Sequence, residues 1–152
     1  MEYQIVKMES RTFAGLTEVT NNTAKDMGAK IGALWTKLYS GMAERIENRT
    51  NGKSVGLYCD YKANGDYTVL TGCQIDSAKT EEARKAGFET RTVPAGSYAK
   101  FTFHGDIQKA VAEAWSKIWQ LPLERTFTGD YEEYQEDTVN GTGTIIIYIA
   151  VK

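Results

Sequence analysis

Hydrophobic and polar positions follow two different periods along this chain. Apolar side chains recur at steps of three and four in residues 27–46 and again in residues 107–118, which predicts two amphipathic helices. Strands are predicted in the extended segments around them, with a bend near Gly15 in the first. These segments are residues 3–19, 54–61, 67–75, 88–104 and 144–151, and residues 126–135 form either a strand pair or one long bent strand.

The helical pattern occurs twice. Residues 31–39 align with residues 111–119, so that Trp35 matches Trp115 and Lys37 matches Lys117. A repeat at about half the chain length indicates two similar modules rather than a solenoid, whose repeats are roughly 20–50 residues long. Each module is predicted to run strand, helix, strand, strand.

The fold class that follows is α+β. Two pseudo-symmetric modules, residues 1–75 and residues 88–152, form an antiparallel sheet with two helices packed on it. The polar segment 76–87, with one possible helical turn, connects them within a single domain of residues 1–152. The junction between duplicated modules is a natural place for a ligand cleft.

Two sequence features refine the predicted sheet. In residues 144–151 both alternating sets are apolar, which is typical of a central strand covered on both faces. Asn64 and Gly65 form a strong hairpin signal between the only two cysteines, Cys59 and Cys73. A two-residue turn pairs Cys59 with Leu70 and puts Cys73 on the opposite face, which favours two reduced thiols, although a bulge would change this parity.

Composition excludes several classes of protein. The chain is 41% hydrophobic and 25% charged, the balance of a globular protein, and its net charge of −2 gives no basic field for direct binding of nucleic acid. No apolar run approaches the roughly 20 residues of a membrane helix, and the first residues lack a signal-peptide core, so a cytoplasmic protein is expected. Two cysteines and a single histidine, His104, are too few for a zinc site, and no cofactor motif occurs.

Several motifs, in this order, resemble the GyrI-like effector-binding domain. The segment 97–105 looks like that family's strand running into a His-Gly helix start, and residues 114–122 look like its helix ending in a Leu-Pro step. Residues 131–134 match an aromatic-Glu-x-Tyr motif, and residues 145–151 match the closing strand. The resemblance covers almost the whole chain. The family forms the ligand-binding half of many AraC-type and MerR-type transcription regulators and also occurs as a stand-alone protein.

The resemblance implies a binding site for lipophilic cations. In several relatives the Glu of the aromatic-Glu-x-Tyr motif lies in a cavity between the modules, and the matching residue here is Glu132, with Tyr134 on the same strand face. Glu133 takes the place of Glu132 if the alignment with the family motif is shifted by one residue. The alternative is that residues 131–137 form only a solvated acidic edge.

Aromatic side chains complete the candidate site. Trp115 and Trp119 share one helix face, and Trp35 and Tyr39 are their copies in the first helix; for each, core packing is the alternative to lining a cavity. Tyr58 belongs to a segment, residues 58–61, that is predicted to occupy the place of residues 131–134 in module one. Tyr67 and Tyr148 are weaker candidates. The predicted ligand-binding residues are therefore Glu132, Trp119, Tyr58, Trp115, Tyr134, Trp35 and Tyr39.

The preferred function is binding of a small amphipathic molecule that is cationic or aromatic, and a lipophilic cation is the expected ligand. Because the chain enters the sheet at Tyr3 with no preceding helix-turn-helix, we expect a sensor or sequestering domain linked to transcription regulation or to toxin and drug response. Two alternatives come from stand-alone relatives. One is a hydrolase of electrophilic toxins, with Glu132 as general base, and the other is a protein inhibitor of DNA gyrase.

Overall fold

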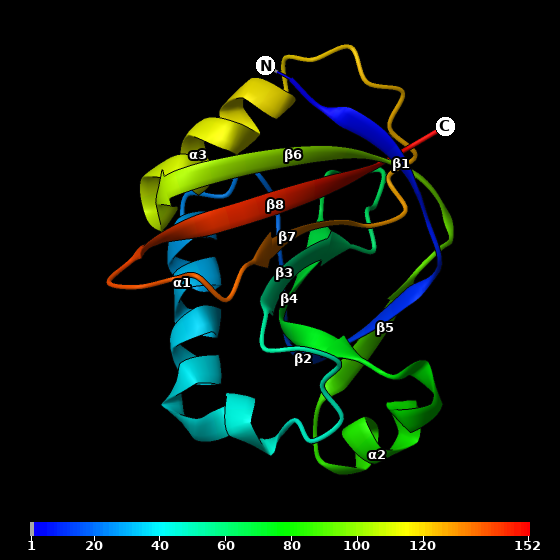
Figure 1. Ribbon diagram of the computed structural model, residues 1–152, viewed down its shortest axis with the longest axis vertical. Coiled ribbons are helices and arrows are strands. Elements are labelled where there is room, and N and C mark those ends of the chain that lie inside the picture. The colour runs from blue at the N-terminus through cyan, green and yellow to red at the C-terminus, as the bar shows by residue number, and fades with distance from the viewer. Residues whose placement is uncertain (1) are drawn as a thin grey trace.

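A single antiparallel sheet of eight strands runs through the computed structural model, which describes residues 2–152 (Figure 1). The spatial order of its strands is β1-β6-β8-β7-β3-β4-β2-β5. The strands are β1 (Gln4–Met8), β2 (Arg11–Thr20), β3 (Ser54–Cys59), β4 (Tyr67–Ile75), β5 (Glu89–Val93), β6 (Gly96–Asp106), β7 (Asp130–Tyr134) and β8 (Thr142–Val151).

The two predicted helices are present. Helix α1 (Met27–Lys37) continues through a π-helical turn and a 3-10 turn to Arg45, and α3 (Ile107–Ile118) has Asp106 as its N-cap. The Asp106 carboxylate accepts a hydrogen bond from the Lys109 amide, as expected of an acidic residue at a helix start. The connector between modules holds the short helix α2 (Thr80–Lys85), which packs at the edge of the sheet against β5 and β2.

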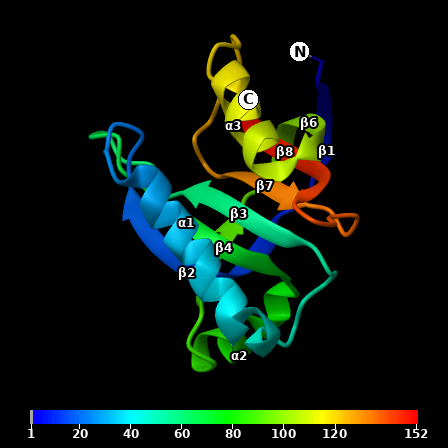
Figure 2. The same cartoon turned by 90° about the vertical axis from the view of Figure 1, so that its left-hand side faces the viewer.

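The predicted α+β class and its two-module plan are confirmed. From the pair β3–β7 outward, the order is β3, β4, β2 in one half and β7, β8, β6 in the other. Each half is therefore strand, helix, strand, strand in sequence, and the halves meet along one antiparallel strand pair. Helices α1 and α3 lie on either side of this junction (Figure 2).

Two long predicted strands are each broken, which is a correction to the sequence-based prediction. The segment 3–19 bends at residues 9 and 10 rather than at Gly15, and β1 pairs with β6 of the other half while β2 pairs with β4. The segment 88–104 likewise divides into β5, which pairs with β2, and β6. An edge strand of each module, β1 or β5, thus pairs with the other module. The local hydrophobic pattern does not encode this long-range pairing.

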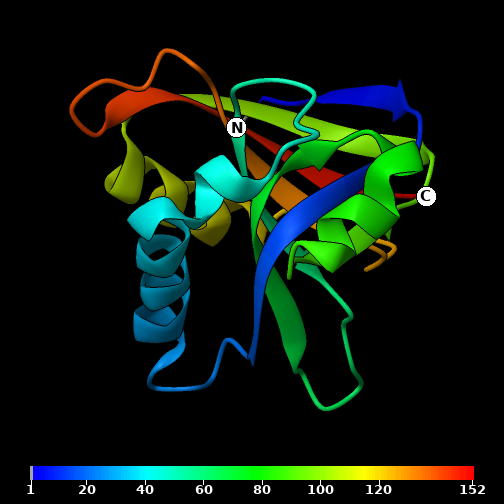
Figure 3. The same cartoon turned by 90° about the horizontal axis from the view of Figure 1, so that it is seen from below.

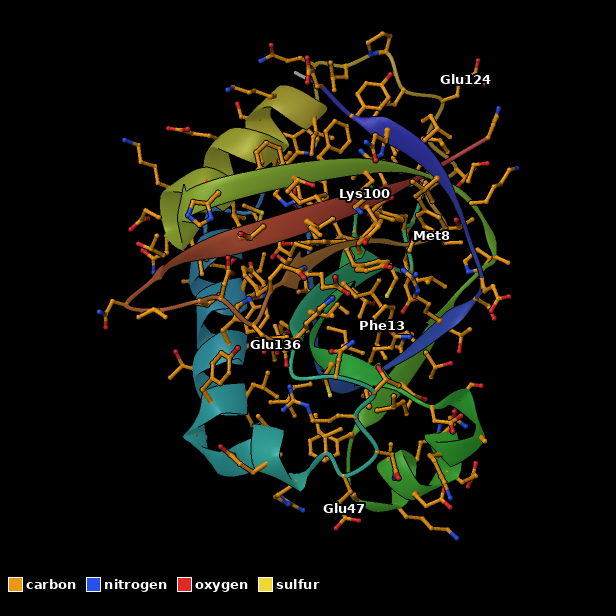
Figure 4. The ribbon with its side chains drawn as sticks, in the orientation of Figure 1. Met8, Phe13, Glu47, Lys100, Glu124 and Glu136 are labelled. Carbon is orange, nitrogen blue, oxygen red and sulfur yellow. The ribbon has the colours of Figure 1, made fainter. Side chains whose placement is uncertain are left out.

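The sheet is strongly curved, as the view from below shows (Figure 3). Phe13 of β2 lies inside the curve (Figure 4), with its ring 4.9 Å from that of Tyr131 on β7, although two strands separate β2 and β7 in the sheet. Strand β8 is central, as predicted, with Ile147 and Ile149 buried on one face and Ala150 on the other. The curve brings the face away from α1 and α3 together around a buried core that includes Phe13, Leu57 and Tyr131.

The cysteines lie on opposite sheet faces and are both free, as predicted. The turn around Asn64 and Gly65 is longer than two residues, however, because β3 ends at Cys59 and β4 begins at Tyr67, and Cys59 pairs with Thr68 instead of Leu70. The slip is an even number of residues, so the parity that separates the thiols is kept.

Candidate ligand-binding site

A cavity of about 1630 Å³ lies on the helix side of the β3–β7 junction. Helices α1 and α3 form its two long walls, and β3 and β7 form its floor. The loop after α3 and the β3–β4 hairpin border one end, and residues 135–138 border the other. Ligand pockets are commonly about 300–1,000 Å³, so the space accepts a drug-sized molecule with several rings.

Glu132 lies at the floor of this cavity with only 2% of its surface exposed. Three neutral groups donate hydrogen bonds to its carboxylate. The hydroxyls of Tyr134 and Tyr58 donate to Oε1 at 2.8 and 3.1 Å, and the indole Nε1 of Trp115 donates to Oε2 at 2.8 Å. All three donors favour an ionised carboxylate, which only accepts.

Burial and hydrogen bonding oppose each other at this carboxyl group. Burial raises the pKa of Glu132 above its ordinary value, while the hydrogen bonds from Trp115, Tyr134 and Tyr58 hold it down. Burial and the adjacent Glu132 raise the pKa values of Tyr58 and Tyr134 well above that of a free tyrosine. Both hydroxyls therefore keep their protons and act as donors.

No cationic side chain of the described residues balances this carboxylate. Across residues 2–152, no side-chain nitrogen of Lys, Arg or His lies within 4.0 Å of Glu132. The other two buried acids of β7 do have cationic partners. Asp130 accepts from Arg125 Nη2 at 2.6 Å, and Glu133 lies 3.5 Å from Lys53 Nζ.

Gly56 makes room for the carboxylate from the neighbouring strand. It is the register partner of Glu132 across the β3–β7 pair. A Cβ atom at position 56 would lie 2.8 Å from Glu132 Oε1 and 3.2 Å from Cζ2 of Trp35. Any larger residue would therefore displace the acid or the indole.

Aromatic rings surround the acid in matched pairs. The Trp35 ring meets that of Tyr134 edge to face at 5.3 Å, and the Trp115 ring meets that of Tyr58 in the same way at 5.2 Å. Further out, Tyr39 stacks on Trp35 at 5.9 Å. Trp119 lies 6.4 Å from Trp115 in the matching place on α3.

The end of the cavity beyond Trp119 is built around a second buried acid. Asp130 accepts hydrogen bonds from Arg125 Nη2 and Tyr61 Oη, both at 2.6 Å, and from the Ala150 amide at 2.9 Å. The Arg125 guanidinium in turn lies 4.5 Å from the centre of the Phe127 ring. At the opposite end Glu136, which follows β7, lines the cavity near α1 (Figure 4).

All seven residues predicted for the site line this one cavity. The solvated-edge alternative is wrong, since Glu132 and Glu133 are both buried, and Glu133 lies on the sheet face away from the cavity. Trp115 is 8% exposed and combines core packing with its hydrogen bond to Glu132, whereas Trp119 and Tyr39 are 53% and 59% exposed. Whether these side chains bind a ligand stays a prediction.

One predicted correspondence is wrong. Tyr58 was expected to take the place of Tyr131, but register and ring contacts match it with Tyr134, because both lie two residues beyond the Gly56–Glu132 pair. Tyr131 lies on the other face and stacks on Tyr148 at 4.8 Å, so the weaker candidate Tyr148 is outside the cavity.

Sequence reasoning missed several lining residues. Met27 and Ile31 belong to the apolar stripe of α1, which predicts core as readily as cavity. Phe127 lies in an irregular segment, because β7 begins only at Asp130 and residues 126–129 are not a strand. Its left-handed backbone (φ 55°) gave no signal in the sequence. Tyr67, a weaker candidate, does line the cavity.

Residues 2–152, the part of the chain that the structure describes, were compared with the requirements of a metal site and of a membrane-spanning helix. That part of the chain contains no cluster of three or more His, Cys, Asp or Glu side chains arranged to hold a metal ion. It also contains no helix long and apolar enough to cross a membrane.

Similarity to known proteins covers the whole fold. Residues 4–151 match the Cass2 family, described as integron-associated effector binding protein. The chain is 32% identical to the "Putative transcriptional regulator protein YobU" of Bacillus subtilis (strain 168), over 97% of this chain and 96% of that protein.

Two solved structures share the architecture. The integron cassette protein VCH_CASS2, from the mobile metagenome of Vibrio cholerae, has a TM-score of 0.77 and 26% identity, over 99% of this chain and 95% of that one. SAV2435, solved bound to tetraphenylphosphonium, has a TM-score of 0.80 and 21% identity, over 100% of this chain and 94% of that one. By its sequence match over nearly its full length and by its fold, this chain belongs to the Cass2 family of integron-associated effector-binding proteins.

Proposed function

We propose that this protein binds lipophilic aromatic cations in the cavity between its two halves. Glu132 supplies the countercharge, and the rings of Trp35, Tyr58, Trp115 and Tyr134 enclose the ligand. The observation that carries the proposal is a buried carboxylate that faces an open, aromatic cavity and has only neutral hydrogen-bond donors.

A buried charge is costly unless it is paired. The three donors to Glu132 reduce this cost without cancelling the charge, so a positive potential from a ligand is still favourable. Asp130 illustrates the alternative, because the chain itself supplies Arg125 as its partner. Glu132 has no such partner among the described residues, as expected of an acid whose cation is supplied by a bound ligand.

The walls suit the organic part of such a ligand. Tyr and Trp rings attract a cation to their faces by about 0.5–2 kcal/mol each, depending on how far water is excluded. Exposed aromatic side chains such as Tyr39 and Trp119 at the cavity mouth are typical of binding surfaces rather than of cores. A small inorganic cation would leave these rings and most of the volume unused.

The relatives agree with this function. SAV2435, which has the same fold, binds tetraphenylphosphonium, a lipophilic aromatic cation. The family is described as effector binding, and the name of the Bacillus subtilis relative points to transcription. We infer that this chain acts as a sensor or sequestering domain whose ligand is linked to gene regulation.

The test compares two ligands of nearly the same shape. Methyltriphenylphosphonium carries a positive charge, and triphenylphosphine oxide is neutral. All three tryptophans of the chain line the cavity, so tryptophan fluorescence reports binding of either ligand. Glu132→Gln should weaken the phosphonium by about 10- to 100-fold, since two unit charges roughly 6–8 Å apart attract each other by about 2–3 kcal/mol at an effective dielectric constant of about 20. The oxide should change by less than about threefold.

Glu133→Gln is the matched control, because it removes the neighbouring acid on the opposite sheet face. It should leave phosphonium binding unchanged. Equal losses for the charged and the neutral ligand in Glu132→Gln would refute the countercharge role. Recovery of the phosphonium intact after prolonged incubation shows that the protein binds this ligand without altering it.

A further inference from the structure

The cavity repeats itself about a pseudo-twofold axis that passes between β3 and β7. Sheet order is the same in both directions from this pair, and α1 and α3 take matching places. The contact of Trp35 with Tyr134 has its copy in the contact of Trp115 with Tyr58, at 5.3 and 5.2 Å. The site therefore has two nearly equivalent aromatic halves.

The carboxylate is the one central feature that is not duplicated. Glu132 Oε1 accepts from Tyr58 and from Tyr134, one tyrosine of each half. The symmetry mate of Glu132 is Gly56, whose missing side chain leaves the space that the carboxylate occupies. A single negative charge thus lies at the centre of a two-sided site.

Each half extends outward from this centre by a second ring. Tyr39 lies beyond Trp35 toward Ser54, to which its hydroxyl donates at 2.8 Å. Trp119 lies beyond Trp115 at the other end of the cavity, where Tyr61 and Phe127 also line the wall. Because β3 and β7 are antiparallel, the two outer rings point to opposite ends.

We propose that this site selects cations whose charge lies between two flat aromatic arms, in preference to cations with the charge at one end. The inference rests on the proposed function, since it requires Glu132 to pair with the cation. A charge held at the centre places one arm along Trp35 and Tyr39 and the other along Trp115 and Trp119. A ligand with a terminal charge can fill only one of these walls and leaves the other in water.

Two constitutional isomers test this directly. Dibenzyldimethylammonium has its nitrogen between two phenyl rings, and (biphenyl-4-ylmethyl)trimethylammonium has the same formula and charge with its nitrogen at one end. The first should bind about tenfold more tightly, because it covers an aromatic wall in each half, and leaving one wall exposed to water changes affinity by about this factor. Calorimetric titration of the full chain measures both.

Two exposed residues provide the matched variants. Tyr39→Ala and Trp119→Ala remove one outer ring from each half, at positions whose exposure leaves the core intact. Each should weaken dibenzyldimethylammonium by about three- to tenfold. The terminal isomer should respond to only one of them. Thermal unfolding of each variant checks that the fold is kept.

The outcomes separate this inference from the function on which it rests. Equal affinity for the isomers, or a preference for the terminal one, with both still weakened by Glu132→Gln, would overturn the two-armed selection and leave cation binding in place. Binding of both isomers without dependence on Glu132 would overturn the proposed function as well. A tenfold preference that is reduced in the one variant to which the terminal isomer does not respond supports the inference.

Discussion

Strand β7 carries two buried carboxylates two residues apart on one sheet face, Asp130 and Glu132, and their surroundings differ. Asp130 is fully buried and paired with Arg125, with two further donors from Tyr61 and Ala150. Glu132 is almost as buried but is held by neutral donors only. Under the proposed function, this difference separates an acid whose charge the chain balances itself from an acid whose charge a ligand balances.

The largest expected effect concerns Asp130. Asp130→Asn leaves the Arg125 guanidinium largely buried without its countercharge, which should lower the free energy of unfolding by about 3–5 kcal/mol. Glu132→Gln removes no ion pair and should not destabilise the protein at neutral pH. Urea unfolding of the two variants measures the difference, and equal destabilisation would remove the distinction between the two acids.

A smaller effect is expected from pH. Because burial raises the pKa of Glu132, the folded state binds more protons than the unfolded state between the usual glutamate pKa of about 4.3 and the raised value. The free energy of unfolding should therefore fall as pH rises through this window and then level off. Glu132→Gln should lack this fall, so the difference between the two urea midpoints at successive pH values measures it.

Cation binding should have the opposite dependence on pH. The ionised carboxylate is the binding form, so affinity for methyltriphenylphosphonium should decrease as pH falls through the raised pKa of Glu132. Triphenylphosphine oxide should bind equally across this range. A pH-independent phosphonium affinity would contradict the assignment of the charge to Glu132.

The smallest effect compares the two symmetry-related tryptophans. Trp115 donates a hydrogen bond to Glu132, and Trp35 approaches the same acid without one. Trp115→Phe should shift the pH midpoint of phosphonium binding upward, since the lost bond lowers the pKa of Glu132. Trp35→Phe should leave the midpoint unchanged. Equal shifts in both variants would mean that general packing, rather than this bond, sets the acidity.

Much of the fold could be predicted because its signals are local. The three- and four-residue steps of apolar side chains located α1 and α3, and the offset between Trp35 and Trp115 indicated the duplication. Alternating apolar residues on both faces identified β8 as a central strand. The same periodicity placed Glu132 and Tyr134 on one strand face, and both do line the cavity.

The sequence by itself determined the α+β class, the two modules and the residue types available for a site. Tertiary structure alone decided the exchange of β1 and β5 between the halves, the match of Tyr58 with Tyr134, and the position of Phe127. It also decided that Asp130 pairs with Arg125 while Glu132 has no cationic partner among residues 2–152. The physical reason is that hydrophobic period specifies which face of an element is buried, whereas strand register and sheet curvature, which join distant segments, specify what each buried group touches.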